Sequence, residues 1–175
     1  MVAERSWADA MRAEALATLA LTRRDDLEVV PLPPAGQRLG FDLLVRMRGD
    51  GGRGDRELAV EVKGVRAAAR PGLGSGRIRV DAASVDRGEM PLVLFVFDVD
   101  EESGRYAWLR EPIVDRNGKA SLSSNRDLTS ANGVARSVPI RWANLASLDE
   151  SALAEIVALV SKWYGARENG LTDRC

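Results

Sequence analysis

The chain has 175 residues, of which 45% are hydrophobic and 29% are charged, and its formal net charge is -1. These proportions are typical of one globular domain, and no segment approaches the roughly 18 consecutive apolar residues of a membrane helix. The sequence has no histidine and only one cysteine, Cys175, which excludes serine-histidine triads, cysteine-histidine dyads and internal disulfides. Any bound metal must therefore be a hard cation with oxygen ligands. Residues 1–5 resemble no signal peptide, and we expect one cytoplasmic domain over residues 1–175.

A helix is predicted from Ala3 to Thr22, because this segment is rich in alanine and lacks proline and glycine. At about 100° per residue, one face forms an apolar stripe. The stripe contains Ala3, Trp7, Ala10, Met11, Ala17 and Leu21. Glu14 lies in the middle of this stripe, where a buried carboxylate needs a partner or a metal ion. The alternative is a glutamate at the rim that reaches solvent, Arg12 or Thr18.

Two strands are predicted next along the chain. The first, at residues 27–30, ends at the proline-rich segment 31–34. The second, at residues 41–47, alternates so that Asp42 lies opposite its apolar face. That apolar face carries Phe41, Leu43, Val45 and Met47.

A third strand, at residues 58–63, places Glu61 and Lys63 on the face opposite its apolar side chains, and Gly64 ends it. The apolar side chains are Leu58, Val60 and Val62. The glycine-rich segment 49–55 is short enough to make the second and third strands antiparallel neighbours. Asp42, Glu61 and Lys63 are therefore expected at one end of one sheet face.

A basic stretch follows this third strand. From residue 63 to residue 80 the chain has five basic residues and no acidic one, a pattern that favours contact with phosphate. The five are Lys63, Arg66, Arg70, Arg77 and Arg79. Residues 77–80 are predicted to form a strand, and residues 81–87 a short helix capped by Asp81.

The C-terminal half is predicted to add a hairpin and a helix. Residues 91–99 are nearly all apolar, which indicates a central strand buried on both faces, paired with residues 105–110. Residues 116–137 are polar and are expected to form a long surface segment, in which Gly118-Lys119-Ala120 is no phosphate-binding loop because no helix opens there. The last helix, at 148–166, is predicted to start at the capping box Ser147–Glu150 and to end near Gly165. Its apolar stripe contains Leu153, Ile156, Val157, Val160, Trp163 and Tyr164.

The succession of a helix with Glu14, a strand with Asp42, a strand with Glu61-x-Lys63, a short helix and a buried strand resembles the PD-(D/E)xK nuclease superfamily. The resemblance covers roughly residues 3–109. The strand Pro-Leu-Val-Leu-Phe-Val, followed by Tyr-Ala-Trp, is similar to two groups within it. These are the archaeal-type Holliday-junction resolvases and a group of small domains associated with prokaryotic defence systems and mobile elements. Phe41 stands where the family name has proline, a position that varies among relatives.

This resemblance implies an α/β fold with a restriction-endonuclease-like mixed sheet flanked by helices. It implies a Mg²⁺ site, with Mn²⁺ as a substitute, held by Asp42, Glu61 and the backbone carbonyl of Val62. Glu14 would contact a second metal or a metal-bound water, and Lys63 would orient the attacking water or stabilise the charge on phosphorus. The four arginines of the basic stretch would contact phosphates. The expected activity is phosphodiester hydrolysis, on DNA rather than RNA, by a homodimer that does not act on membranes.

Two other interpretations stay open. The same fold with an unused site would be a DNA-binding or partner-docking module. A structural subunit would carry Glu61 and Lys63 only as a surface ion pair, worth at most about 1 kcal/mol. The Trp163–Tyr164 end of the last helix or the Trp108 hairpin could supply a dimer contact or belong to the core. Aromatic residues make up only 5% of the chain, so no platform for base stacking is expected.

Overall fold

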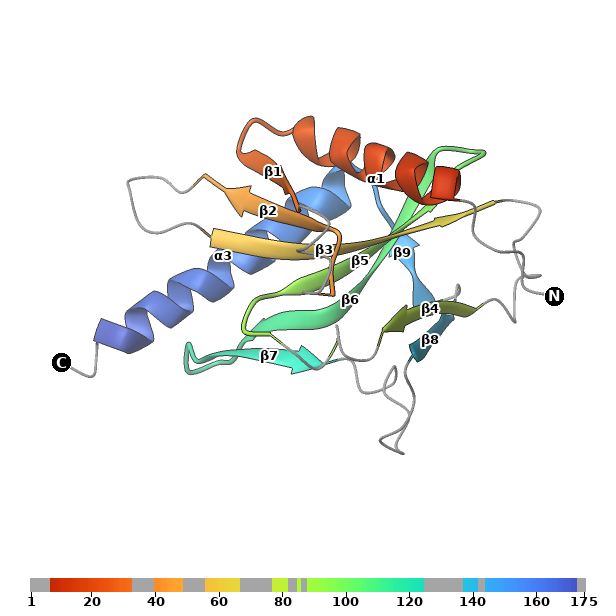
Figure 1. Ribbon diagram of the computed structural model, residues 1–175. Helices are drawn as coiled ribbons and strands as arrows, with labels where there is room; N and C mark the ends of the chain where they lie inside the picture. The colour runs from red at the N-terminus through yellow and green to blue at the C-terminus, as the bar shows by residue number, and fades with distance from the viewer. Residues whose placement is uncertain are drawn as a thin grey trace.

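The computed structural model describes residues 7–32, 40–48, 56–66, 77–81, 85, 88–124, 137–141 and 144–172 (Figure 1). Its elements begin with helix α1 (Trp7–Thr22) and end with helix α3 (Glu150–Thr172). The strands are β1 (Leu27–Pro31), β2 (Leu43–Met47), β3 (Arg56–Val65), β4 (Arg77–Asp81), β5 (Leu92–Asp98), β6 (Ser103–Val114), β7 (Ala120–Ser124), β8 (Ser137–Arg141) and β9 (Ala146–Ser147). None of the described helices is long and apolar enough to span a lipid bilayer.

Seven strands form one mixed sheet in the order β1-β2-β3-β5-β6-β7, with β9 also paired to β6. The strands β1, β2 and β3 form an antiparallel meander, and the antiparallel pairing of β2 with β3 was predicted from the short segment between them. The pair of β3 and β5 is parallel, so the chain must cross over between them, and this crossover contains β4. Strands β4 and β8 form a separate antiparallel pair. The protein is therefore a mixed α/β fold.

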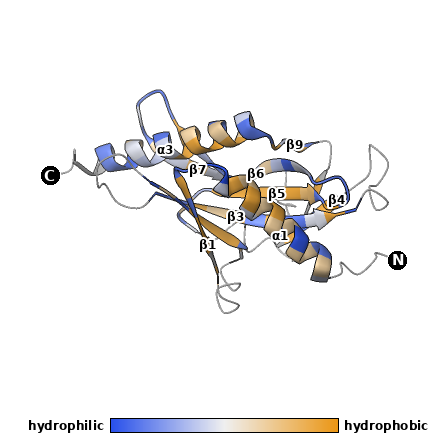
Figure 2. Cartoon of the chain, turned by 90° about the horizontal axis from the view of Figure 1, so that it is seen from above, coloured by the Kyte–Doolittle hydropathy of each residue, from blue (hydrophilic) through white to orange (hydrophobic). Residues whose placement is uncertain are grey.

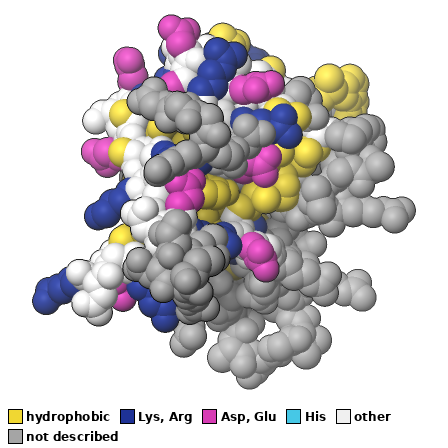
Figure 3. Space-filling view, turned by 90° about the vertical axis from the view of Figure 1, so that its left-hand side faces the viewer, with side chains coloured by type: hydrophobic (Ala, Val, Ile, Leu, Met, Phe, Trp, Pro, Cys, Tyr) yellow, Lys and Arg dark blue, Asp and Glu magenta, His cyan; other side chains and the backbone are white. Residues whose placement is uncertain are grey.

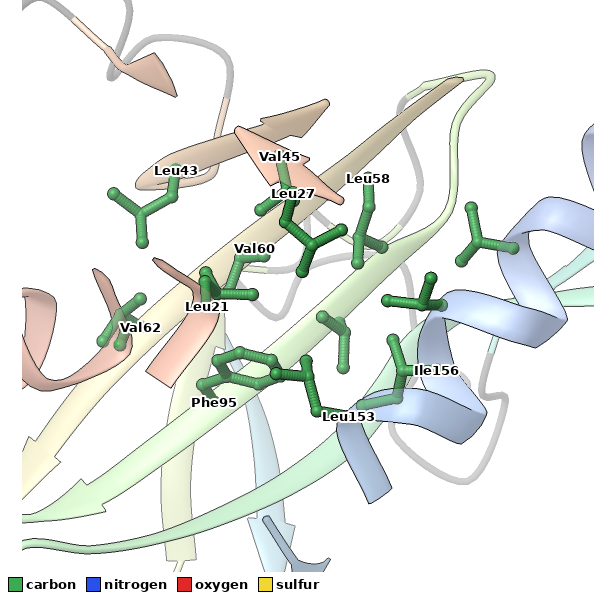
Figure 4. Close-up of a cluster of buried hydrophobic side chains, with 14 of the residues drawn as sticks. Leu21, Leu27, Leu43, Val45, Leu58, Val60, Val62, Phe95, Leu153 and Ile156 are labelled. Carbon is green, nitrogen blue, oxygen red and sulfur yellow. The ribbon is translucent and has the colours of Figure 1, made fainter. Parts of the chain in front are cut away.

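Both described helices pack on one face of the large sheet. Their buried side chains join those of β2, β3 and β5 in one hydrophobic cluster, which Figure 4 shows in part. A second cluster lies on the other face, where Ile78, Val80, Val85 and Ile140 cover Ala59 and Leu94. Because the sheet is covered on both sides, every residue of β5 is buried, and from Leu92 to Phe97 the strand is hydrophobic, as Figure 2 shows.

The predicted apolar stripe of α1 is confirmed for Ala17 and Leu21 but is wrong for Trp7 and Met11. The buried residues of this helix are Ala13, Ala17 and Leu21, whereas the side chains of Trp7 and Met11 are 76% and 59% exposed. Three apolar residues at a spacing of four define the packed face, and two of the three are alanine. The prediction assigned the large apolar residues to the core because of their hydrophobicity. Close contact between the helix and the sheet instead favours alanine.

Gly64 makes this close contact possible. It lies within β3, which continues to Val65, and therefore does not end the strand as predicted. A Cβ atom at Gly64 would be 2.7 Å from the backbone oxygen of Asp9 and 3.2 Å from the Cβ of Ala13. The absence of a side chain therefore sets the distance between α1 and β3.

The segment 116–137 contains a strand that the sequence prediction missed. After a turn at Asp115–Lys119, β7 pairs with β6. Oδ1 of Asp115 accepts hydrogen bonds from the N–H groups of Asn117 and Lys119, and Gly118 adopts a φ of 77°. The Asn117-Gly118 dipeptide is a common hairpin signal and could have revealed this turn. Residues 125–136 lie outside the described residues.

The last helix also differs from its prediction at both ends. Asp149, not Ser147, caps it, because Oδ1 of Asp149 accepts a hydrogen bond from the N–H of Ala152. The helix passes through Gly165 and continues to Thr172. Its predicted apolar stripe is confirmed, with Leu153, Ile156, Val157, Val160 and Trp163 buried. Most of the short helix predicted at 81–87 lies outside the described residues, and Asp81 is the last residue of β4.

Replacing Gly64 by valine should destabilise the protein by about 1–3 kcal/mol, because the new side chain must push α1 away from β3. Urea unfolding followed by circular dichroism measures this effect. The matched control is Gly165→Ala in α3, where an added Cβ meets nothing within 4 Å. That change should stabilise the protein by about 0.5–1 kcal/mol. Equal stability of wild type and Gly64→Val would refute the packing role.

Candidate active site

The candidate site lies where β2 begins alongside the middle of β3. The first residue of β2, Leu43, pairs with Val60, so residues 61–65 of β3 extend beyond its partner. Asp42 occupies the start of this unpaired edge. Its N–H donates to the carbonyl of Val60 at 2.9 Å, and its Oδ2 accepts the N–H of Val62 at 2.7 Å. The Asp42 carboxylate thus accepts the hydrogen bond that a backbone carbonyl would accept if β2 were longer.

The carbonyl oxygen of Val62 shares this edge with Asp42. In an extended strand the N–H and C=O of one residue point to the same side. Since the N–H of Val62 points to Asp42, its carbonyl also points to the side where β2 is absent. A carboxylate and a backbone carbonyl, both oxygen ligands of the type that Mg²⁺ prefers, therefore lie close together.

Glu61 and Lys63 lie on the face of the sheet that is opposite α1. They share this face with Ala59, which belongs to the cluster under β4 and β8. The Nζ of Lys63 and Oε1 of Glu61 form an ion pair, and the two side chains are only 18% and 9% exposed. The structure places Glu61 and Lys63 together, as predicted, and Asp42 at the edge of the same strand beside Val62.

Glu14 approaches the same region from α1, on the opposite face. Burial raises the pKa of its carboxyl above the ordinary value, the negative charge of Asp42 raises it further, and the positive charge of Lys63 lowers it. These effects place Glu14 within electrostatic range of both residues. It lies beside the buried face of α1 and is only half-buried, so it lies at the rim of the apolar face, as in the alternative interpretation, and not in its middle.

The four predicted site residues lie around the open edge of β3 and do not converge on a single position. They are Glu14, Asp42, Glu61 and Lys63. In the part of the chain that the structure describes, no group of three or more acidic side chains is close enough to hold a metal ion. Fewer oxygen ligands than predicted could hold a cation here. They are the Asp42 carboxylate, the Val62 carbonyl and the carboxylate of Glu61, the preceding residue of β3. Their oxygen chemistry fits Mg²⁺ or Mn²⁺.

The arginines of the basic stretch have different environments. Arg66 donates to Asp9 of α1 at 2.6 Å and to Asp100 of the β5–β6 turn at 3.2 Å. Its charge is already paired with two carboxylates, so its evident role is to fasten α1 to the β5–β6 turn. Arg79 is exposed on β4. The backbone of Arg77 belongs to β4, but its side chain and the whole of Arg70 lie outside the described residues.

The exposed residues Trp7 and Met11 also belong to the surroundings of the site. At about 100° per residue, Trp7, Met11 and Glu14 fall on the same flank of α1. The other flank is occupied, because Arg12 pairs with Glu102 and Asp9 pairs with Arg66. Sequence analysis missed this apolar surface because it placed both residues in the core. The alanine spacing at positions 13, 17 and 20 was the signal for the true buried face.

The aromatic residues considered for a dimer contact belong to the core. Trp163 is 2% exposed, and its Nε1 donates to the carbonyl of Ser121 at 2.7 Å. The hydroxyl of Tyr164 donates to the carbonyl of Glu57 at 2.9 Å. Trp108 packs against the main hydrophobic cluster. Of the two alternatives for these residues, packing within the chain is the one that the structure shows.

The sequence matches no protein-family model, and no curated protein is significantly similar to it. The assignment of function therefore rests on the site itself.

The raised pKa of Glu14 predicts a pH-dependent effect of Glu14→Gln. Between the ordinary value of 4.5 and its higher folded-state pKa, Glu14 binds more protons in the folded protein than in the unfolded one. Its contribution to stability therefore falls as the pH rises through this interval. The variant should unfold at a higher urea concentration than wild type near pH 7, and the difference should shrink near pH 4.

The matched control for Glu14 is Glu155→Gln, which changes an exposed carboxylate of α3. Urea unfolding of the three proteins at both pH values makes the comparison. A stabilisation of the Glu14 variant that is the same at both pH values would contradict the assigned cause.

Proposed function

We propose that the protein is a metal-dependent nuclease that hydrolyses phosphodiester bonds, with DNA as the preferred substrate. The observation that carries this proposal is the open edge of β3, where the Asp42 carboxylate and the Val62 carbonyl lie together. Glu61 and Lys63 follow on the same strand. The order of these residues on β2 and β3, with β5 parallel to β3, supports the resemblance to the PD-(D/E)xK superfamily.

Asp42 is suited to hold a cation without losing its structural role. Its Oδ2 accepts the Val62 N–H, while Oδ1 accepts no hydrogen bond from the described part of the chain. Asp42, Glu61 and the Val62 carbonyl would hold Mg²⁺ or Mn²⁺. When bound, the ion would offset the negative charge of the phosphate and make water acidic enough to supply hydroxide.

Lys63 and Glu14 have distinct roles in this proposal. The ammonium of Lys63 is held beside Glu61 and would stabilise the negative charge that develops on the phosphate, or orient the attacking water. Glu14 faces the region from α1 with a raised pKa, so it can accept a proton more readily than an ordinary glutamate. It would act on a metal-bound water or contact a second metal.

The burial of the Glu61–Lys63 pair favours an active site over a structural ion pair. Strands β2 and β3 also carry a more exposed ion pair, Arg46–Glu57, whose side chains are 39% and 27% exposed. Those of Lys63 and Glu61 are 18% and 9% exposed. Removing a charged pair from water costs free energy that the attraction often fails to return. A catalytic role explains why polar residues occupy this position.

An inactive nuclease fold that binds DNA or a protein partner is the second candidate. Such a module would contact phosphates through Arg79, as the nuclease would. Arg70 and Arg77 are further predicted phosphate contacts. We place the active nuclease first because both carboxylates and the lysine lie along one stretch of β2 and β3. A homodimer, a cytoplasmic location and a role in prokaryotic defence or mobile elements remain part of the proposal.

The deciding experiment is cleavage of supercoiled plasmid and of a synthetic four-way junction, with Mg²⁺, Mn²⁺ or EDTA. Wild type should cut only with metal. Lys63→Ala and Asp42→Asn should each lower the rate at least about a hundredfold, because each removes charge from the reacting region. Asp42→Asn retains an oxygen that can accept the Val62 N–H, so loss of activity is not loss of the strand-edge hydrogen bond.

Glu57→Gln is the matched control for cleavage, since Glu57 is a carboxylate on the same strand with a surface partner. It should cut at the wild-type rate. Absence of cutting by wild type, together with DNA affinity that is equal in all four proteins, would favour the binding module. Preference for the junction over the plasmid would indicate a resolvase.

Trp7→Ala should weaken binding to DNA with unpaired bases. Trp7 and Met11 are exposed on the flank of α1 that carries Glu14, and stacking of a base on an aromatic ring is worth about 1–3 kcal/mol. We expect about a tenfold or larger loss of affinity for a single strand, measured by fluorescence anisotropy in EDTA, and retention of affinity in Trp7→Phe.

The control for Trp7 is Leu19→Ala, because Leu19 is also exposed on α1, at 56%, but lies away from Glu14. Its affinity for the single strand should equal that of wild type. An equal loss in the Trp7 and Leu19 variants would show that the effect is general to the helix surface.

A further inference from the structure

A basic cleft lies between the β6–β7 turn and the C-terminal half of α3. Its volume is about 740 Å³, within the range of small-molecule sites. Lys119 lines it from the turn, and Lys162 and Arg167 line it from α3, and none of the described residues that line it is acidic. β7 is the last strand of the sheet on the side opposite β1 and β2, so the cleft is separate from the candidate active site.

The charges in this cleft are available to a ligand. Neither Lys119 nor Lys162 has a carboxylate partner among the residues that the structure describes. The guanidinium of Arg167 stacks 4.8 Å from the centre of the Trp163 ring and donates to the carbonyl of Glu89 at 3.1 Å. Arg167 is therefore held in place before any ligand binds, which lowers the entropy cost of binding.

The walls of the cleft are also fixed. Asp115 holds the β6–β7 turn through the N–H groups of Asn117 and Lys119. The hydrogen bond from Trp163 to the carbonyl of Ser121 joins α3 to β7. Since the N–H groups of the turn are already bonded, an anion must be bound by side chains, unlike in a phosphate-binding loop of the Gly-Lys-Ser type.

Figure 3 shows the side of the molecule that is on the left in Figure 1, where α3 ends. On the described part of this side, basic and acidic side chains are interspersed. The charged side chains among the described lining residues are all basic, which is therefore a local feature and not a general property of the surface.

We propose that this cleft binds a phosphate group, carried either by a small anion or by the backbone of a nucleic-acid strand. Two ammonium groups and one guanidinium match the charge of a phosphate that is doubly ionised or part of a phosphate chain. No aromatic residue is among the described residues of the lining, so recognition is of phosphate rather than of a base.

The test is calorimetric titration of the full chain in EDTA with inorganic phosphate, pyrophosphate and a short single-stranded oligonucleotide. EDTA keeps divalent metal out of the candidate active site. Wild type should bind at least one of these ligands. The double variant Lys119→Ala and Lys162→Ala should lose at least about tenfold in affinity for that ligand and keep the wild-type unfolding midpoint.

Arg116→Ala is the matched control, because Arg116 is an exposed cation of the same turn that does not line the cleft. Its affinity should stay within about twofold of wild type. Binding of phosphate or pyrophosphate identifies a small-anion site. Binding of the oligonucleotide alone identifies a strand contact. In that case the slope of log affinity against log salt concentration should be smaller in magnitude by about 1.4 in the double variant, because two phosphate contacts are lost. The proposal would be overturned if wild type bound none of the three ligands, or if wild type and the double variant bound with equal affinity.

Discussion

The close contact between α1 and β3 at Gly64 is the constraint on which the site depends. Only a residue without a side chain fits under the backbone of Asp9 and the methyl group of Ala13. The contact sets the height of α1 above the sheet, and with it the distance from Glu14 to Asp42. The ion pairs of Arg66 with Asp9 and Asp100 then fix the N-terminal end of the helix to the β5–β6 turn. The helix is therefore held by packing in its middle and by charge near its end.

The arrangement of the sheet could be predicted well from the sequence, because burial imposes a clear alternation. The antiparallel neighbours β2 and β3 and the buried strand β5 follow from period-two patterns and short turns. The same logic placed Asp42, Glu61 and Lys63 together. The parallel pairing of β3 and β5 brings in β4 and β8, and this second layer depends on contacts between residues about 60 positions apart, which no local pattern encodes.

The errors arose where side-chain size and hydrophobicity gave conflicting signals. On α1, hydrophobicity favoured Trp7 and Met11 for the core, but the distance between helix and sheet is set by alanines and by Gly64. On α3, Gly165 suggested a helix end, yet packing through Trp163 and Tyr164 keeps the chain helical beyond it. Arg66 was grouped with phosphate ligands because its partners, Asp9 and Asp100, are distant in sequence.

The start of β2 explains why the candidate site is at this place in the sheet. If β2 began one or two residues earlier, its backbone would pair with Val62 and leave no open edge. Instead, Asp42 supplies the hydrogen bond that Val62 needs and adds a negative charge where the Val62 carbonyl already concentrates negative potential. Burial of Glu14 raises the pKa of its carboxyl, and the negative charge of Asp42 raises it further. Lys63 offsets only part of this charge, since it is paired with Glu61. A divalent cation at this strand edge, as in the proposed function, would offset the charge of Asp42 that Lys63 leaves uncompensated.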